Sequence, residues 1–311
     1  MSKVSAWISD LAHAWDGFWF SPRDGKLPGL IRLLTGLIVF YTHLVWTPLL
    51  MRFLGPEGML PPAYRQQFFD SSFAWSHFDL CTTPGMIWAA HIVALVVMLL
   101  FALGFWTRTT GIITALFVIS YANRATGALF GLDQIAGFLV LYLAISNCGD
   151  SFSIAKRLGI GKAQIKSSIA NNIAIRLIQI HLCIVYLFAG LGKCQGEKWW
   201  NGEAIWGAVA SYEYQTIDMT WMANQMWLVS LITLVTLIFE VGYVGLIWHR
   251  LTRPVMLLLA IPLHLGIGLC MGMLEFGLIM LVANLSFCDS CLLYTSPSPR
   301  DQRGSRMPSS A

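Results

Sequence analysis

Long apolar runs separated by short polar segments dominate the chain and predict eight membrane-spanning helices. The runs cover about residues 30–50, 86–106, 111–123, 132–146, 173–191, 227–248, 255–271 and 275–287. A helix needs about 20 apolar residues to cross a bilayer, so 111–123 and 132–146 are short for a simple crossing. We expect neighbouring helices to bury these two, or a turn to lie within the membrane. The pattern therefore predicts an all-α, polytopic transmembrane helical bundle.

A different periodicity marks the N-terminus, where aromatic and apolar residues recur at spacings of three and four. They are Trp7, Leu11, Trp15, Phe18 and Trp19, with Lys3, Asp10 and Asp16 between them. This arrangement is typical of an amphipathic helix that lies in the membrane interface. It does not indicate a cleavable signal peptide, because an uninterrupted apolar core is missing. We expect an interfacial helix at 1–26 and a transmembrane domain at 27–288.

The last residues differ from everything before them. From Cys291 the chain reads CLLYTSPSPRDQRGSRMPSSA, which is rich in Ser, Pro and Arg and resembles translated sequencing-adapter read-through. We expect 289–311 to be a non-native tail with no part in the fold. The natural C-terminus, and any domain that follows it, is therefore not determined by this sequence.

The composition supports the membrane assignment and excludes several other classes. Apolar residues make up 56% of the chain and charged residues 12%, whereas soluble domains are about 25% charged. The net charge of +4 is scattered, so no basic face indicates a nucleic-acid partner. The cysteines lie singly apart from Cys288 and Cys291, and one CxxC without partners is a weak metal or redox signal. No HxxxH or HExxH spacing occurs, and we predict no metal site.

The positive residues predict the orientation of the bundle. With eight spans and an inside N-terminus, ten Lys and Arg residues fall on the inner side and five on the outer side. The inner ones are Lys3, Arg23, Lys26, Arg108, Lys156, Arg157, Lys162, Lys166, Arg250 and Arg253, and the outer ones are Arg52, Arg65, Arg124, Lys193 and Lys198. This bias favours an N-in, C-in topology. In that topology the Lys193 end of the fifth span faces outward.

Ionisable residues inside the spans are candidates for function, because each is costly in hydrocarbon. They are His43, His91, Asp133, His181, Glu240, His264 and Glu275, with Lys193 at the rim. Glu240 and His264 flank the turn at 250–254 at similar distances, so we expect them to converge at one depth on neighbouring antiparallel helices. Both residues also have a purely structural interpretation, in which each forms hydrogen bonds between helices.

Lys193 follows the small residues Ala189, Gly190 and Gly192, which would let another backbone approach closely. Two interpretations of this lysine remain open. Its stem could lie along the helix and carry the ammonium to water, with Trp199 and Trp200 forming an interfacial belt. Alternatively, burial could leave a neutral amine that accepts a proton.

At these residues the chain resembles a known family. The segment AGLGKCQGEKWWNGEAIW (189–206) is similar to the signature of the horizontally transferred transmembrane (HTTM) family, to which vitamin K-dependent gamma-glutamyl carboxylase belongs. The matching pieces are Gln179, Tyr186, Ala189, Gly190, Lys193, Trp200 and Gly202, and the resemblance continues near 133–157 and 254–288. The carboxylase has two consecutive lysines where this chain has Gly192 and Lys193. Its large lumenal C-terminal region has no counterpart here.

The resemblance implies a quinol-dependent membrane enzyme with Lys193 as the catalytic base. Trp199, Trp200, His264 and Glu240 are then candidates for substrate binding, and the implied cosubstrate is a reduced, vitamin K-like quinone. Oxygen adds to the deprotonated quinol, and the product removes an unreactive proton from a second substrate, which in the carboxylase is a protein glutamate. The implied reactions are epoxidation and carboxylation, and the implied location is a bacterial inner membrane. The partners would be the bilayer, quinone and a protein or peptide substrate.

Two other function classes remain. The chain could be a non-catalytic binding or immunity-type helical bundle, in which Lys193 is an anchor. A transporter is less favoured, because neither an inverted repeat nor paired broken helices are visible in the sequence.

Overall fold

The computed structural model describes residues 3–59, 61, 75–160 and 167–288, and its regular secondary structure is helical. The predicted tail at 289–311 lies outside the described residues. The α-helices are α1 (Lys3–Phe20), α2 (Lys26–Leu44), α3 (Leu50–Leu54), α5 (Pro84–Leu103), α6 (Thr107–Arg124), α7 (Gly131–Ile145), α8 (Ile154–Arg157), α9 (Ile169–Cys194), α10 (Glu197–Trp200), α11 (Ala204–Val209), α12 (Met226–Leu246), α13 (Arg253–Cys270) and α14 (Leu274–Asn284).

Each of the eight predicted spans corresponds to one helix of the bundle, and the predicted fold class is confirmed. In the described part of the chain, five segments are long and apolar enough to cross a membrane: Lys26–Leu54, Pro84–Leu103, Ile169–Cys194, Met226–Leu246 and Arg253–Cys270. Helices α7 and α14 are shorter apolar helices. Helix α6 is longer than predicted, because the polar turn Thr107–Thr110 continues its apolar run as helix.

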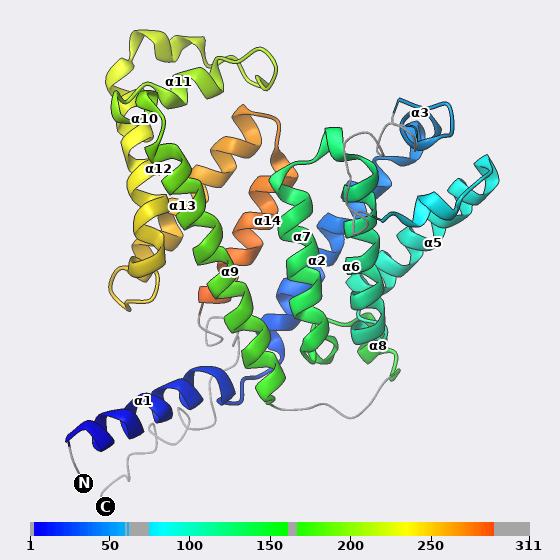
Figure 1. The fold of residues 1–311 in the computed structure, drawn as a ribbon, viewed down its shortest axis with the longest axis horizontal. Coiled ribbons are helices and arrows are strands. Elements are labelled where there is room, and N and C mark those ends of the chain that lie inside the picture. The colour runs from blue at the N-terminus through cyan, green and yellow to red at the C-terminus, as the bar shows by residue number, and fades with distance from the viewer. Residues whose placement is uncertain (1–2, 60, 62–74, 161–166, 289–311) are drawn as a thin grey trace, which may run out of the picture.

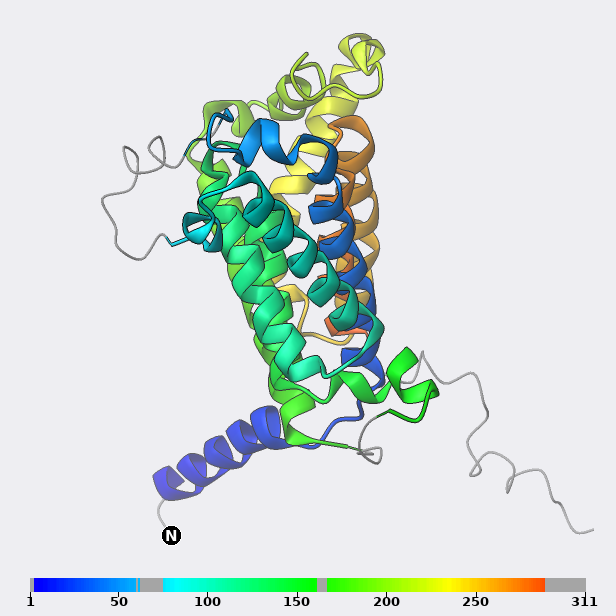
Figure 2. The same ribbon diagram turned by 90° about the vertical axis from the view of Figure 1, so that its right-hand side faces the viewer.

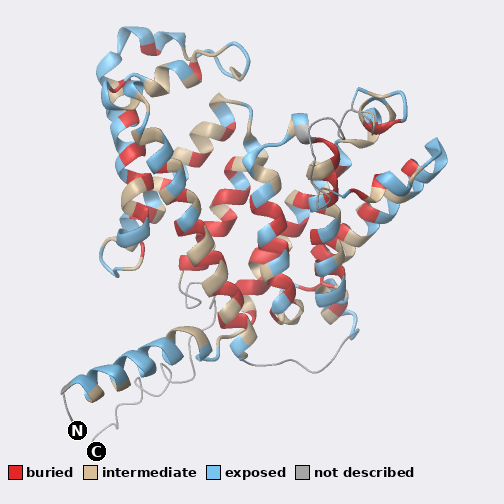
Figure 3. Ribbon diagram, viewed as in Figure 1, coloured by how far each residue is buried: buried red, intermediate tan, exposed pale blue. Residues whose placement is uncertain are grey.

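Of the two spans predicted to be too short to face lipid alone, α6 is 18 residues long and α7 is 15, and α7 lies among neighbouring helices, as does the short helix α14. Helix α14 packs against α2, α7, α9 and α13, and α7 packs against α6 and α9. Figure 3 shows buried residues concentrated on these central helices and exposed residues on the outward faces of α5 and α12. Burial inside the protein removes the need for a full-length apolar surface.

Helix α9 connects the two ends of the bundle, as Figures 1 and 2 show. At 26 residues it is the longest of the described helices, and it packs against α12 on one side and α7 on the other. Helix α1 lies at its N-terminal end, while α10 and α11 lie at its C-terminal end (Figure 1). The C-terminal end of α9, where Lys193 lies, is therefore at the opposite end of the bundle from α1.

Helix α1 confirms the predicted N-terminal helix over Lys3–Phe20, and its place in a membrane interface stays a prediction. It extends away from the bundle (Figure 1), and Trp7, Leu11 and Trp15 are exposed. Its last turn is tied to α9: Asn172 Nδ2 donates to the Phe18 and Trp19 carbonyls at 2.7 and 2.9 Å. The exposed apolar face fits the interfacial location.

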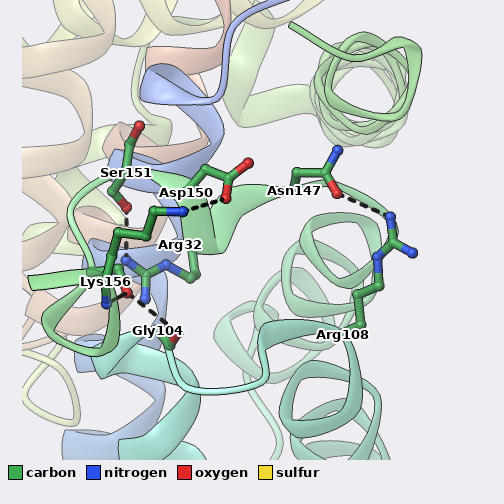
Figure 4. A network of polar contacts seen from close by, with 8 residues as sticks. Arg32, Gly104, Arg108, Asn147, Asp150, Ser151 and Lys156 are labelled. Carbon is green, nitrogen blue, oxygen red and sulfur yellow. Dashed lines mark hydrogen bonds and ion pairs between the residues drawn. The ribbon is translucent and has the colours of Figure 1, made fainter. Parts of the chain in front are cut away.

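A network around Arg32 ties together the end of the bundle opposite Lys193 (Figure 4). The Arg32 side chain is fully buried on α2. Its guanidinium donates to the carbonyls of Phe101 and Ala102 at the end of α5, and to those of Ser151 and Phe152 before α8. One side chain thus joins three segments that are distant in the sequence.

Candidate functional site

One face of α9 carries the residues of the candidate site. Gln179, Tyr186, Gly190 and Lys193 are spaced by seven, four and three, which places them on one side of a helix. Gln179, Tyr186 and Gly190 are buried, and Lys193 lies in the last turn. A cation suits that position, because the carbonyl end of a helix carries partial negative charge.

Lys193 pairs with Glu240 on α12. Its Nζ lies 2.9 Å from Oε1, to which it donates a hydrogen bond, and 2.8 Å from Oε2. The exposed fractions of the two side chains are 26% and 9%. Nζ also lies 5.3 Å from the centre of the Trp199 ring, a cation–π distance. The Lys193 ammonium therefore contacts a carboxylate and an aromatic ring.

Close packing of α9 on α12 makes this pairing possible, and Gly190 permits it. A Cβ atom at Gly190 would lie 2.8 Å from Val241 Cγ2, 3.0 Å from Val241 N and 3.2 Å from Glu240 Cβ. The predicted close approach is thus confirmed at this glycine. It does not occur at Gly192, where a Cβ atom would meet nothing within 4 Å.

Gly190→Ala is therefore expected to push α9 and α12 apart and to weaken the Lys193–Glu240 pair. Overpacking of this kind costs about 1–3 kcal/mol of unfolding free energy. Thermal unfolding of the detergent-purified protein measures the effect, with Gly192→Ala as the matched control that should unfold like wild type. Equal unfolding temperatures for the two variants would contradict the packing argument.

An apolar cavity of about 570 Å³ lies beside the pair. Helix α12 contributes Leu231 and Val235 to its wall, and α13 contributes Leu259, Leu263 and Gly266. Trp199, Met219, Met222 and Phe276 also line it. Among the described residues of its wall, Lys193 and Glu240 carry the only formal charges. The cavity thus joins a long apolar surface to one ion pair.

The segment between α9 and α12 forms a cover over this cavity and contributes Ile205, Met219 and Met222 to its wall. Gly202 has a φ of 76° and lies so close to Ser230 on α12 that a Cβ atom would be 2.8 Å from its Oγ. Ile205 N donates to Thr233 Oγ1 at 3.2 Å. Further on, Thr220 donates to Asp218 through its backbone N and its hydroxyl, and these bonds lower the pKa of that carboxyl. Backbone and side-chain bonds therefore hold the cover in place.

A buried polar network adjoins the site deeper in the bundle. Tyr186 Oη lies 2.5 Å from His264 Nε2 and accepts from Asn284 Nδ2 at 3.0 Å. Tyr243 Oη donates to Asn284 Oδ1 at 2.6 Å. In the described residues, His264 Nδ1 has no hydrogen-bond partner. Residues from α9, α12, α13 and α14 meet in this network.

The structure places the predicted site residues in different surroundings. Glu240 and Trp199 line the cavity with Lys193. His264 is buried, as expected, but its hydrogen bond goes to Tyr186 and that of Glu240 goes to Lys193, so the expected pairing of Glu240 with His264 is not direct. Trp200 is 63% exposed, donates to the Cys194 carbonyl at 2.8 Å and does not line the cavity.

Sequence reasoning did not identify Glu240 as the partner of Lys193, nor Met219 and Met222 as part of the cavity. The sequence did contain one signal for the pairing of Glu240 with Lys193. A cation and a carboxylate within one membrane domain each carry a burial cost that pairing offsets. The loop methionines carry no comparable signal, because only the fold brings their segment over the cavity.

Comparison with protein-family models gives a match to the HTTM domain over residues 21–290. Comparison with curated proteins gives no match. Comparison with solved structures gives none either.

Proposed function

The chain belongs to the HTTM-domain family, and we propose that it is a membrane enzyme that uses Lys193 to deprotonate a reduced quinone drawn from the bilayer. The observation that carries the proposal is the amine at the wall of an apolar cavity. A quinol has the matching shape, with an aromatic ring that bears hydroxyl groups and an apolar tail.

The cavity fits such a molecule in size and in chemistry. Small-molecule sites usually measure about 300–1,000 Å³, and this cavity measures about 570 Å³. A hydroxyl group would lie against Lys193 and Glu240, while the ring would lie against Trp199 and Phe239. The tail would follow the aliphatic side chains between α12 and α13. Mostly apolar walls with a few polar groups are what binding sites for such ligands present.

Access from the membrane is supported by the exposure of the wall residues. Leu231 is 51% exposed and Val235 is 37% exposed, and both line the cavity. Helix α12 is one of the helices apolar enough to cross the bilayer. An apolar ligand could therefore enter from the lipid without passing through water.

The residues of the site supply proton transfer and positioning. A general base must lie within hydrogen-bond reach of the proton that it removes. Lys193 meets this condition for a hydroxyl held against Glu240 and Trp199. A reduced quinone, when bound and deprotonated, supplies the reaction with oxygen that drives a second, harder proton abstraction. The proposed acceptor of that step is a protein or peptide, which would reach the cavity from the end of the bundle where α10 and α11 lie.

We place the site on the outer side of a bacterial inner membrane, with both ends of the described chain inside. The supporting observation is the bias of Lys and Arg residues toward the inner segments. A cosubstrate from the bilayer and a second substrate from outside would then meet near Lys193.

A variant that fills the cavity tests the proposal. Gly266 lines the cavity, and a Cβ atom there meets nothing within 4 Å, so Gly266→Phe is expected to fit and to occupy the quinol's place. Gly245→Phe is the matched control, because Gly245 on α12 is equally open and lies outside the cavity. The purified proteins would be compared for consumption of a reduced short-chain 1,4-naphthoquinone in air. We expect a loss of about tenfold or more for Gly266→Phe only.

Two outcomes would contradict the proposal. Equal consumption by Gly266→Phe and Gly245→Phe would show that the cavity is not the site. A folded wild-type protein that neither binds nor consumes the quinol would favour the non-catalytic bundle, in which the Lys193–Glu240 pair only holds α9 against α12.

A further inference from the structure

The contact between Lys193 and Glu240 raises a chemical question for the proposed base. The lysine of an ion pair is an ammonium, which has three N–H donors and no lone pair. It cannot accept a proton until it has lost one. Among the described residues, the group in hydrogen-bond contact with its Nζ is the Glu240 carboxylate, at 2.9 Å from Oε1.

We propose that Glu240 takes this proton, so that the Lys193–Glu240 pair, and not the lysine alone, is the base of the site. This inference rests on the function proposed above. It assigns a proton-carrying role to a carboxylate 47 positions away from the lysine on another helix.

The surroundings of Glu240 favour such a transfer. Its side chain is 9% exposed, and it lies beside a cavity whose other walls are apolar. Oε2 lies 2.8 Å from Nζ but has no hydrogen-bond partner of good geometry in the described part of the chain. A buried carboxylate held by one hydrogen bond is poorly solvated. Transfer of a proton within the pair leaves two neutral groups, which removes the burial cost of the Glu240 charge.

Every proton that moves in this step passes between Lys193, Glu240 and the substrate. First, an N–H bond of the Lys193 ammonium breaks and an O–H bond forms on Glu240, which leaves a neutral amine and a carboxylic acid. Next, the O–H bond of the substrate breaks and an N–H bond forms on the amine. The new ammonium faces the negative oxygen of the substrate, so the site with its ligand has no net charge before or after the step.

Gly190 and the hydrogen-bonded network set the geometry that the transfer requires. Gly190 brings the α12 backbone close enough to hold Glu240 against Lys193. Tyr243, one turn after Glu240, is anchored to Asn284 at 2.6 Å. A close backbone contact and a hydrogen bond thus fix the helical turn that carries Glu240, which favours a constant geometry for the transfer.

Infrared difference spectroscopy tests the assignment without turnover. Under anaerobic conditions, addition of a reduced short-chain 1,4-naphthoquinone to the wild-type protein is expected to produce the C=O stretching band of a protonated carboxyl group. The band should shift in deuterium oxide and be absent from Glu240→Gln. It should persist in Glu275→Gln, the matched control on α14, which changes the same residue type outside the cavity. A band that survives in Glu240→Gln, or never forms in wild type, would overturn the inference.

Quinol consumption by Lys193 and Glu240 variants then separates the proton-carrying role of Glu240 from the proposed function. Glu240→Gln is expected to lower quinol consumption by about 10²-fold or more, as loss of an acid–base group does. Glu240→Asp keeps a carboxyl group and should retain the infrared band. This variant therefore still tests the role of the carboxyl group if Glu240→Gln does not fold. If Lys193→Ala loses turnover but Glu240→Gln does not, the shared-proton role is wrong and the quinol function stands. If neither variant loses turnover, the proposed function itself fails.

Discussion

Replacing Lys193 with arginine is expected to abolish most quinol turnover, by about 10²- to 10⁴-fold, while the bundle stays folded. Arginine keeps the positive charge and can still donate to Glu240, so the ion pair and the contact with the Trp199 ring are retained. It remains protonated at any pH at which the protein is folded, however, and cannot serve as a base. The substitution thus separates a structural ion pair from a proton acceptor.

Lys198→Arg is the matched control for this variant. Lys198 lies five residues further along on α10 and is exposed. Both variants would be compared with wild type for consumption of the reduced naphthoquinone and for thermal unfolding in detergent. Wild-type turnover in Lys193→Arg would end the proposed role of the lysine. Loss of turnover together with loss of the fold would call for Lys193→Ala in a variant that also carries Glu240→Gln, which leaves no buried charge unpaired.

Arg32→Leu is expected to cause the largest loss of stability, at the opposite end of the bundle. The guanidinium is fully buried and donates to the carbonyls of Phe101, Ala102, Ser151 and Phe152. A buried acceptor left without a partner costs about 1–3 kcal/mol. The bonds to Phe101 and Ala102 are buried and those to Ser151 and Phe152 are partly buried, while the Phe101 carbonyl keeps a bond from Gly104 N. The expected loss is therefore a few kcal/mol, a large share of the stability of a domain, which is about 5–15 kcal/mol.

The backbone conformation at Phe152 makes the fold depend further on the Arg32 hydrogen bonds. Phe152 has a φ of 51°, a left-handed conformation that is unfavourable for a residue with a Cβ atom. Arg32 holds its carbonyl at 2.5 Å. Without that bond, the segment before α8 would lose the contact that compensates for its conformation.

Arg108→Ala provides the comparison, because Arg108 belongs to the same end of the bundle (Figure 4) but is exposed and donates one hydrogen bond, to Asn147, among the described residues. Detergent-extracted yield, size-exclusion profile and thermal unfolding measure the effect. Arg32→Leu should aggregate or unfold at a much lower temperature, and Arg108→Ala should resemble wild type. Similar unfolding of the two variants would show that the Arg32 hydrogen bonds contribute little.

Local composition was enough to predict the class of the fold and the position of the lysine. The cost of exposing polar backbone or charged side chains to hydrocarbon depends on each segment by itself, so the apolar runs predict α2, α5, α6, α7, α9, α12, α13 and α14 without reference to contacts. The same cost reduces the candidates for function to a short list that contains Lys193 and Glu240.

The start of α6 is a feature that hydropathy did not predict. Its apolar stretch predicts a helix from 111, but the helix begins at Thr107, because polar residues at a membrane surface continue a helix as readily as apolar ones. Hydropathy measures transfer into lipid and does not detect the end of backbone hydrogen bonding.

The sequence by itself therefore determined that this chain is a membrane-spanning helical bundle with a lysine at the C-terminal end of its fifth predicted span. Only the tertiary structure decided that Gly190, and not Gly192, is the point of close approach, that Trp199, and not Trp200, lines the cavity, and that Glu240 is the partner of the lysine. The physical reason is that neighbouring residues on a helix point in different directions. Which of them meets another helix depends on the rotation and crossing of helices that are far apart in the sequence.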